Sequence, residues 1–218
     1  MWHWRPPPVT ELEYVQIRAE WADELAQVEL ACFPTADPAD LYNPALLRDI
    51  CEVFPEGGFA VLDGDRPIAM GLGVRVDFDF DHYQHGISEV VGVHGHEGHR
   101  PQGAWYYGTT ITVLPTYRRH GIGRRLYELR KDVCRRLNLR GIVAGGVIPG
   151  YSDHIADMSA QEYVDQVQAG ELYDATLSFQ IENGFEARGV IADYITDPAV
   201  GNWAALIVWD NPDFEESG

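Results

Sequence analysis

Thr110 to Leu126 read TITVLPTYRRHGIGRRL, and this stretch decides which fold the chain can adopt. Its β-branched beginning, TITV, predicts the end of a strand, and Gly121 and Gly123 lie in a turn that opens an amphipathic helix. At such a junction the first helical amides have no partner, and the helix dipole favours negative charge. Positive charge around the glycines comes from Arg118, Arg119 and Arg124. The stretch therefore predicts an anion site that suits a pyrophosphate.

Two other phosphate-binding motifs do not fit this turn. It lacks the Gly-Lys-Ser/Thr ending of a nucleotide P-loop. Gly121-Ile122-Gly123 also lacks the third glycine of a dinucleotide-binding turn. Backbone amides assisted by arginines remain as the way in which this turn would hold an anion.

Charge is distributed unevenly along the chain. The formal net charge of −18 argues against nucleic acids or anionic membranes as partners, because both need a basic protein surface. Nine of the sixteen basic residues nevertheless lie between Arg118 and Arg140, together with two acids, so this segment carries +7 (nine minus two). Such a local patch can hold a small polyanion. For the outer arginines, Arg130, Arg135 and Arg136, a solvated helix face is an equally good interpretation.

Length and composition favour one soluble domain over residues 1–218. The chain has 218 residues, of which 45% are apolar, enough to bury one sizeable core. Its three cysteines are an odd number without metal-ligand spacing, which favours reduced thiols in the cytoplasm over disulfides or a zinc site. No stretch resembles a signal peptide or the roughly 20 apolar residues of a membrane span. We therefore expect a cytoplasmic protein without a membrane or nucleic-acid partner.

Apolar periodicity predicts a mixed α/β (α+β) succession of elements. An Asp-Gly turn at residues 63–64 indicates a hairpin, and a strand, helix and strand over residues 105–148 imply a parallel pair. Strands are predicted at residues 15–18, 59–62, 68–76, 105–113, 141–148, 190–195 and 203–209, and helices at 22–33, 44–54, 121–137, 159–170 and 176–182. Residues 77–104 are expected to form a polar insertion, and residues 211–218 a frayed tail.

Arg118-Arg119-His120-Gly121-Ile122-Gly123 matches the Arg/Gln-x-x-Gly-x-Gly/Ala signature of the GNAT superfamily of acyl-CoA N-acyltransferases. The order of elements along nearly the whole chain also resembles that family. The resemblance implies a GNAT fold, in which a mixed sheet of about seven strands is flanked by about four helices. It further implies that the strand at 105–113 and the strand at 141–148 splay apart to admit a ligand.

The same resemblance implies a co-substrate, acetyl-CoA or another short acyl-CoA, and no metal. The backbone amides of Arg119, His120, Gly121, Ile122, Gly123 and Arg124, beside Arg118, would hold the coenzyme A pyrophosphate. Ile111, Thr112 and Val113 would pair like a strand with the pantetheine arm. Gly145-Gly146 is consistent with a closely approaching ligand, and equally with tight helix packing.

The activity implied by the resemblance is transfer of an acetyl or other short acyl group to a primary amine of a small molecule or peptide. An acidic surface outside the donor site favours a cationic acceptor. Several stretches, including Tyr173–Gln180 and Asn183-Gly184-Phe185, resemble the GNAT domain that occurs fused to nitrilase-type carbon–nitrogen hydrolases, although we assign no part of these 218 residues to a hydrolase. The alternatives are a non-catalytic acyl-CoA sensor and a partner module for a separate hydrolase.

The catalytic groups depart from the family pattern. Tyr107 stands where many members carry a glutamate base, and Gln180 where a tyrosine acid is frequent. A tyrosine with its usual pKa of about 10 is a poor base at neutral pH. A bound water relayed to another group, or attack by an already neutral amine, fits Tyr107 better. Replacement candidates are Glu89 as the base and Tyr173 as a hydroxyl near the thiolate, with a surface carboxylate and a rim aromatic as the alternative interpretations.

Histidines gather in the polar insertion. His94, His96 and His99 lie near Glu97, and near His82 and His85, which allows a metal site, a substrate-lining loop or a solvated loop. We favour the last two, because His-x-His-x-x-His interrupted by glycines matches no established metal site. The N-terminal Trp2 and Trp4, with the prolines after them, are expected to dock on the core or on a second copy of the chain.

Overall fold

One mixed sheet carries the strands of the computed structural model, which describes residues 11–92 and 96–216. Its seven strands follow the order β1-β2-β3-β4-β5-β7-β6, and every neighbouring pair is antiparallel except β4 and β5. The strands are β1 (Glu13–Gln16), β2 (Phe59–Asp63), β3 (Arg66–Val76), β4 (Trp105–Val113), β5 (Gly141–Val147), β6 (Glu186–Ile191) and β7 (Ala204–Asp210). Trp2, Trp4 and His94 lie outside the described residues.

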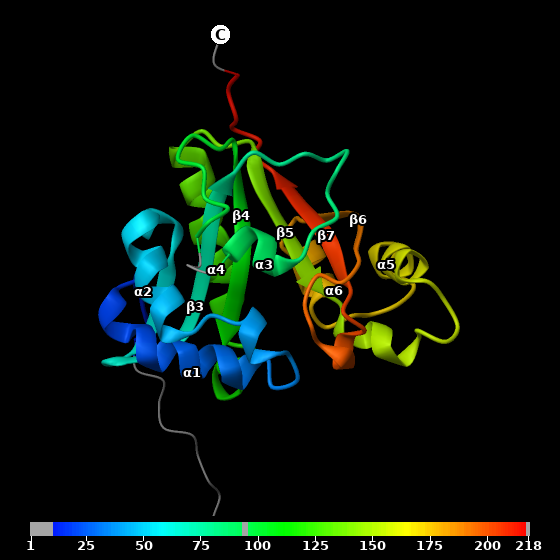
Figure 1. Ribbon diagram of the computed structural model, residues 1–218, viewed down its shortest axis with the longest axis horizontal. Helices are drawn as coiled ribbons and strands as arrows, with labels where there is room; N and C mark the ends of the chain where they lie inside the picture. Colours follow the sequence, from blue (N-terminus) through cyan, green and yellow to red (C-terminus); the bar gives the residue numbers. More distant parts are fainter. Residues whose placement is uncertain (1–10, 93–95, 217–218) are drawn as a thin grey trace, which may run out of the picture.

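Six α-helices in the described part of the chain cover the two faces of the sheet (Figure 1). They are α1 (Ala22–Cys32), α2 (Pro44–Val53), α3 (Ile87–Val91), α4 (Ile122–Arg136), α5 (Ala160–Gln168) and α6 (Leu177–Glu182). The helices α1, α2 and α3 share one buried apolar cluster, and α4, α5 and α6 share another on the opposite face. The count exceeds the expected four or so; α3 and α6 are short, with five and six residues, and α3 lies in the segment for which no helix was predicted. Among the described helices, none is long and apolar enough to cross a bilayer.

Side-chain caps explain where two of these helices begin. Asn43 Oδ1 accepts hydrogen bonds from the amides of Ala45 (2.9 Å) and Leu46 (3.1 Å), which confirms the predicted start of α2. At α5, Ser159 and Glu162 form a reciprocal capping box. These caps satisfy amides that would otherwise be unpaired, so short-range sequence fixes both helix starts.

The polar insertion contains structure that its composition did not predict. The amide of Gly86 donates to Glu89 Oε1 over 2.8 Å and starts α3. Ile87 and Val91, one helical turn apart, are buried against the α1 side of the sheet. The insertion therefore packs over the sheet with a short helix in its middle.

Two boundaries near the C-terminus differ from the prediction. The strand β6 ends at Ile191, because Asp193 turns the chain away with a φ of 49°. Residues 211–216 do not fray. Asn211 Nδ2 donates to the carbonyl of Leu139 over 2.9 Å, and the amide of Glu215 donates to Asn138 Oδ1 over 2.9 Å. These bonds attach the tail to the loop between α4 and β5.

The two parallel strands separate, as expected. The register joins β4 to β5 only through Tyr106 with Ile142 and Tyr107 with Val143. On the other side of β4, Gly73 pairs with Gly108 and Leu72 with Thr110, so Thr109 is an extra residue in the strand. Such a bulge bends the strand. The bulge lies two residues after Tyr107, the last residue of β4 that pairs with β5, and the strands diverge in this region.

Candidate functional site

A cavity of about 750 Å³ occupies the gap between the diverging strands. One end is lined by the turn before α4, and the other reaches Glu29 in α1 and Ile87 and Val91 in α3. Because α4 and α1 cover opposite faces, the cavity passes through the sheet. A long ligand lying in it would present one end to each face.

The turn before α4 has the backbone of an anion site. Arg119 has a φ of 65° and Gly121 a φ of 79°, and Gly121 caps α4 without any side-chain hydrogen bond to the first amides. Alternating left-handed residues make a concave nest of amides, and the helix dipole adds to its attraction for anions. The exposed side chains of Arg118, Arg119 and Arg124 line the same end of the cavity.

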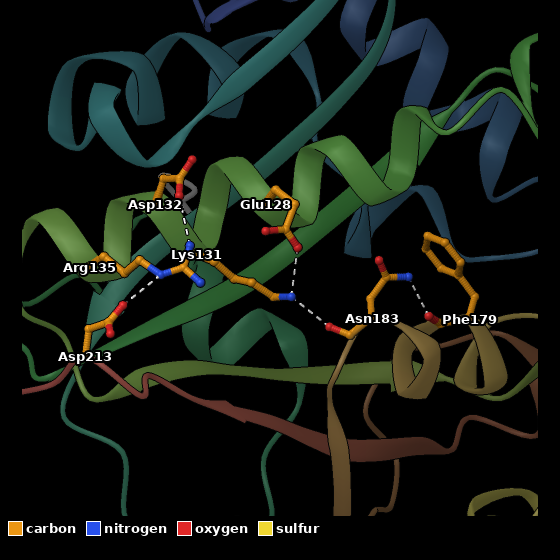
Figure 2. Close-up of polar contacts among 7 residues, drawn as sticks. All are labelled: Glu128, Lys131, Asp132, Arg135, Phe179, Asn183 and Asp213. Carbon is orange, nitrogen blue, oxygen red and sulfur yellow. Dashed lines mark hydrogen bonds and ion pairs between the residues drawn. The ribbon is translucent and has the colours of Figure 1, made fainter.

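The helix α6 closes this end of the cavity and is held by α4. The ring of Phe179 lies against Gly123, where an added Cβ would come within 3.1 Å of Phe179 Cζ. Figure 2 shows how α6 is held: Lys131 Nζ donates to the carbonyl of Asn183 over 2.8 Å, and Asn183 Nδ2 donates to the carbonyl of Phe179 over 2.7 Å. Gly123 therefore permits close approach of α6. The same glycine belongs to the turn of the anion site, so its lack of a side chain serves both helix packing and that turn.

Two of the outer arginines of α4, Arg130 and Arg135, have structural roles. Arg135 pairs with Asp132 at 2.9 Å and with Asp213 at 3.2 Å (Figure 2). Arg130, for which a solvated face was considered, is buried with 2% of its surface exposed. Its guanidinium donates to the carbonyl of Leu72 over 2.8 Å and to the carbonyl of Thr110. Arg130 thus holds the bulge of β4 from the α4 side.

The opposite face of the bulge is held by a buried carboxyl group. Thr110 Oγ1 donates to Glu29 Oε2 over 3.1 Å, and the amide of Tyr42 also bonds to this carboxyl. Glu29 has 2% of its surface exposed, and it lines the cavity. Burial raises its pKa from 4.5 to about 8. A group that titrates near neutral pH in a cavity can accept or release protons during a reaction.

A second polar group of side chains lies where β4 and β5 still pair. Tyr107 is fully buried, and its hydroxyl bonds to His85 Nε2 at 2.6 Å and to the Tyr194 hydroxyl at 3.2 Å. The other ring nitrogen of His85 is 2.6 Å from the carbonyl of Tyr83, so it donates there and Nε2 accepts from Tyr107. Burial lowers the pKa of His85 and raises that of Tyr107 well above its usual value. Both groups are neutral near pH 7.

Three buried side-chain atoms have no hydrogen-bond partner among the described residues: Thr112 Oγ1, Arg130 Nε and Gln180 Oε1. All three residues line the cavity. Of the three, Gln180 Oε1 is an acceptor and Arg130 Nε a donor. An unpaired buried polar atom costs about 1–3 kcal/mol. A polar ligand between the strands would relieve that cost.

Nine of the ten residues expected to bind the donor line the cavity. They are Ile111, Thr112, Val113, Arg118, Arg119, Gly121, Ile122, Gly123 and Arg124. His120 does not: it is exposed, with Nδ1 3.1 Å from the carbonyl of Tyr117. Its side chain points back at the preceding turn.

The three catalytic candidates lie in different places. Glu89 is exposed on α3, on the side away from Ile87 and Val91, which line the cavity, and its carboxylate serves as the helix cap. Tyr107 is near the cavity but reaches it only through Tyr194. Tyr173 lies at the rim with 75% of its surface exposed. The structure therefore brings none of the three to the buried part of the cavity.

The histidines act separately. His85 bonds to tyrosines, His82 Nδ1 lies 2.9 Å from Asp79, and His99 Nδ1 accepts the amide of Arg75 over 3.2 Å. Within residues 11–92 and 96–216, no group of three or more His, Cys, Asp and Glu side chains is arranged to hold a metal ion.

Sequence reasoning missed Glu29, Arg130 and Tyr194. For Glu29 a signal was present, because it follows Leu25 by four residues and therefore lies on the apolar side of α1. A charged residue on an apolar stripe needs a partner or a function. Its partner, Thr110, is 81 positions away, and nothing local reveals it.

Comparison with known proteins agrees with this geometry. Residues 22–150 match the acetyltransferase (GNAT) family. The chain is 36% identical over 193 residues to the probable hydrolase YhcX of Bacillus subtilis (strain 168), covering 88% of this chain and 37% of that relative. It is 29% identical over 190 residues to the uncharacterized N-acetyltransferase YkwB of the same organism, covering 87% of this chain and 84% of the relative. The chain thus spans well under half the length of the hydrolase relative.

Solved structures share the fold at low sequence identity. The loading GNATL domain of CurA from Lyngbya majuscula has a TM-score of 0.77 at 20% identity, over 92% of this chain and 98% of that one. The GphF GNAT-like decarboxylase in complex with isobutyryl-CoA has a TM-score of 0.76 at 21% identity, over 91% and 98%. The match over residues 22–150, together with the splayed sheet and its glycine turn, shows that this chain belongs to the acetyltransferase (GNAT) family.

Proposed function

We propose that this chain transfers an acetyl or other short acyl group from acyl-CoA to a primary amine of a small molecule or peptide. The cavity between β4 and β5 carries the proposal, because it connects an arginine-lined anion site at α4 with a buried carboxyl group at α1. A donor with phosphates at one end and a thioester at the other matches this arrangement, because the phosphates would lie in the anion site and the thioester would lie toward the carboxyl group. The likeness to an N-acetyltransferase over 87% of the chain supports the same reaction class.

The residues at the donor end fit coenzyme A. The amides after Gly121 and the side chains of Arg118, Arg119 and Arg124 would hold its pyrophosphate. Its pantetheine arm carries amide N–H groups, and Gln180 Oε1 is a buried acceptor without a partner. Bound acyl-CoA supplies the activated acyl carbon; the chain supplies the binding groups and the environment around the acceptor.

The acceptor end is acidic. Glu29, Asp40 and Asp197 line it, and the apolar Ile87 and Val91 of α3 border it. Glu29 is mostly protonated near pH 7, so the carboxylates of Asp40 and Asp197 would attract a protonated amine and raise its local concentration. This end therefore suits a cationic acceptor.

Two specific observations favour other functions. Tyr107 and Gln180 replace the expected base and acid, which favours a sensor that binds acyl-CoA without turnover. The likeness to 37% of a probable hydrolase favours a module that works beside a separate hydrolase.

The deciding experiment combines a transfer assay with a binding measurement. Acetyl-CoA is incubated with the protein and a panel of polyamines, aminoglycosides, lysine and peptides, and released thiol is followed while calorimetry measures coenzyme A affinity. We expect thiol release that depends on one class of amine. Binding without acceptor-dependent release across the panel would favour the sensor, and absence of binding would refute the donor site.

A further inference from the structure

We propose that Glu29 accepts the proton that the acceptor amine loses during transfer, and is the general base of this site. The inference rests on the proposed function and assigns a residue to the step for which Tyr107 and Glu89 are unsuited. Glu29 lines the cavity, although only 2% of the residue's surface is exposed, and its carboxyl group bonds to Thr110, which also lines the cavity.

The splay of the sheet indicates where the reacting carbon lies. β4 pairs with β5 through Tyr106 and Tyr107, and the strands separate beyond them. A donor anchored at the turn before α4 runs back along β4 and must stop where the strands meet. Its thioester would therefore lie beside residues 108–110, where Thr110 Oγ1 donates to Glu29 Oε2 over 3.1 Å. This placement would bring the acyl carbon to the part of the cavity that Glu29 lines.

The other carboxylates at this end are engaged in local structure. Asp197 accepts the amide of Ala199 over 3.0 Å and the Thr35 hydroxyl over 3.1 Å. Asp40 accepts the amide of Thr196 over 2.8 Å. These bonds hold Asp197 and Asp40 in the loops after α1 and β6, so both carboxylates already serve local structure.

His85 is also less suited to direct proton transfer. Both of its ring nitrogens have partners, Tyr83 and Tyr107, and the residue does not line the cavity. A proton could reach it only through the hydroxyls of Tyr194 and Tyr107. Glu29 needs no such relay.

The transfer step balances with Glu29 as acceptor. The acceptor amine first loses a proton to solvent and becomes neutral. Its lone pair then forms a C–N bond to the thioester carbonyl carbon, and the C–S bond breaks, with its electron pair leaving on sulfur. The proton released from nitrogen goes to the Glu29 carboxylate. The thiolate takes one proton from solvent, and Glu29 returns its proton to solvent after product leaves.

The surroundings of Glu29 favour titration in the working range of a base. Its pKa of about 8 results from burial, opposed by hydrogen bonds from Thr110 and the Tyr42 amide. Tyr42 and Cys32 face it, and burial raises the pKa of both, so both are neutral near pH 7. Positive charge reaches this region from Arg118, beside Cys32, and from Arg130, across Thr110. The rate of acyl transfer should therefore rise with pH as Glu29 ionises.

The test compares Glu29→Gln with Glu24→Gln, an exposed glutamate of the same helix. Glutamine keeps an oxygen for the Thr110 hydroxyl but cannot take a proton. With an amine that the wild type acylates, we expect Glu29→Gln to lower kcat by about 10²-fold or more and to lose the rising pH limb. Coenzyme A affinity should stay unchanged, and Glu24→Gln should behave as wild type.

A readout without substrate accompanies the kinetics. Infrared spectra of the free protein should show a protonated buried carboxyl band that titrates near pH 8 and is absent from Glu29→Gln. Glu29→Asp, which retains a carboxyl group, should keep more activity than Glu29→Gln, and the reverse order would overturn the assignment. Wild-type rate and pH profile in Glu29→Gln would overturn it too. Absence of transfer by the wild type would overturn the proposed function itself.

Discussion

Replacing Glu29 by glutamine should remove a pH-dependent loss of stability, whatever the catalytic role of this residue. Burial raises the pKa of its carboxyl group from 4.5 to about 8 in the folded protein. The raised pKa means that folding favours the protonated form. The contribution to stability is therefore complete below pH 4.5 and is lost as the pH rises through about 8.

The size of this effect follows from the shift. A change from 4.5 to about 8 is about 3.5 pKa units. At about 1.36 kcal/mol per unit, the free energy of unfolding falls by roughly 5 kcal/mol over the full range. About 4 kcal/mol of that falls between about pH 5 and about pH 9. Glutamine does not ionise, so the variant lacks this slope.

Urea unfolding at a series of pH values measures the effect. The difference in unfolding free energy between wild type and Glu29→Gln cancels the contributions of the other titrating groups. That difference should change by several kcal/mol from about pH 5 to about pH 9. The exposed control Glu24→Gln should show a nearly constant difference. Parallel curves for wild type and Glu29→Gln would refute the reasoning that burial governs this carboxyl group.

Three further substitutions test other parts of the structure. Asp174→Ala removes a buried carboxylate that accepts four hydrogen bonds, one from the amide of Gly150 at 2.9 Å. The substitution should lower the free energy of unfolding, measured by urea titration, by about 2–4 kcal/mol. A loss below about 1 kcal/mol would contradict this. Gly123→Glu places bulk and negative charge in the anion site and should abolish coenzyme A binding measured by calorimetry. Unchanged affinity in a folded variant would exclude this turn as the donor site. Tyr107→Phe leaves His85 Nε2 without its donor and should destabilise the protein by about 1–3 kcal/mol, with an unaltered urea midpoint as the contrary result.

Residues near one another in the chain determined much of this protein. Asn43 before a proline predicted the start of α2, and the apolar run at 141–148 predicted a buried strand, because caps and periodicity act over a few positions. The stretch from Thr110 to Leu126 predicted the strand, the turn and α4. The same stretch supplies most of the residues that line the donor end of the cavity.

Only the tertiary structure decided the acceptor end. Glu89 lies in a polar segment and was a reasonable candidate, but the packing of Ile87 and Val91 turns it toward solvent. Glu29 meets Thr110 because α1 packs across the bulge of β4, 81 positions along the chain. Its unusual titration arises from burial, and burial depends on every element that packs around the group. Sequence alone therefore determined the local geometry of the proposed donor site, whereas the assembled core decided which glutamate lines the cavity.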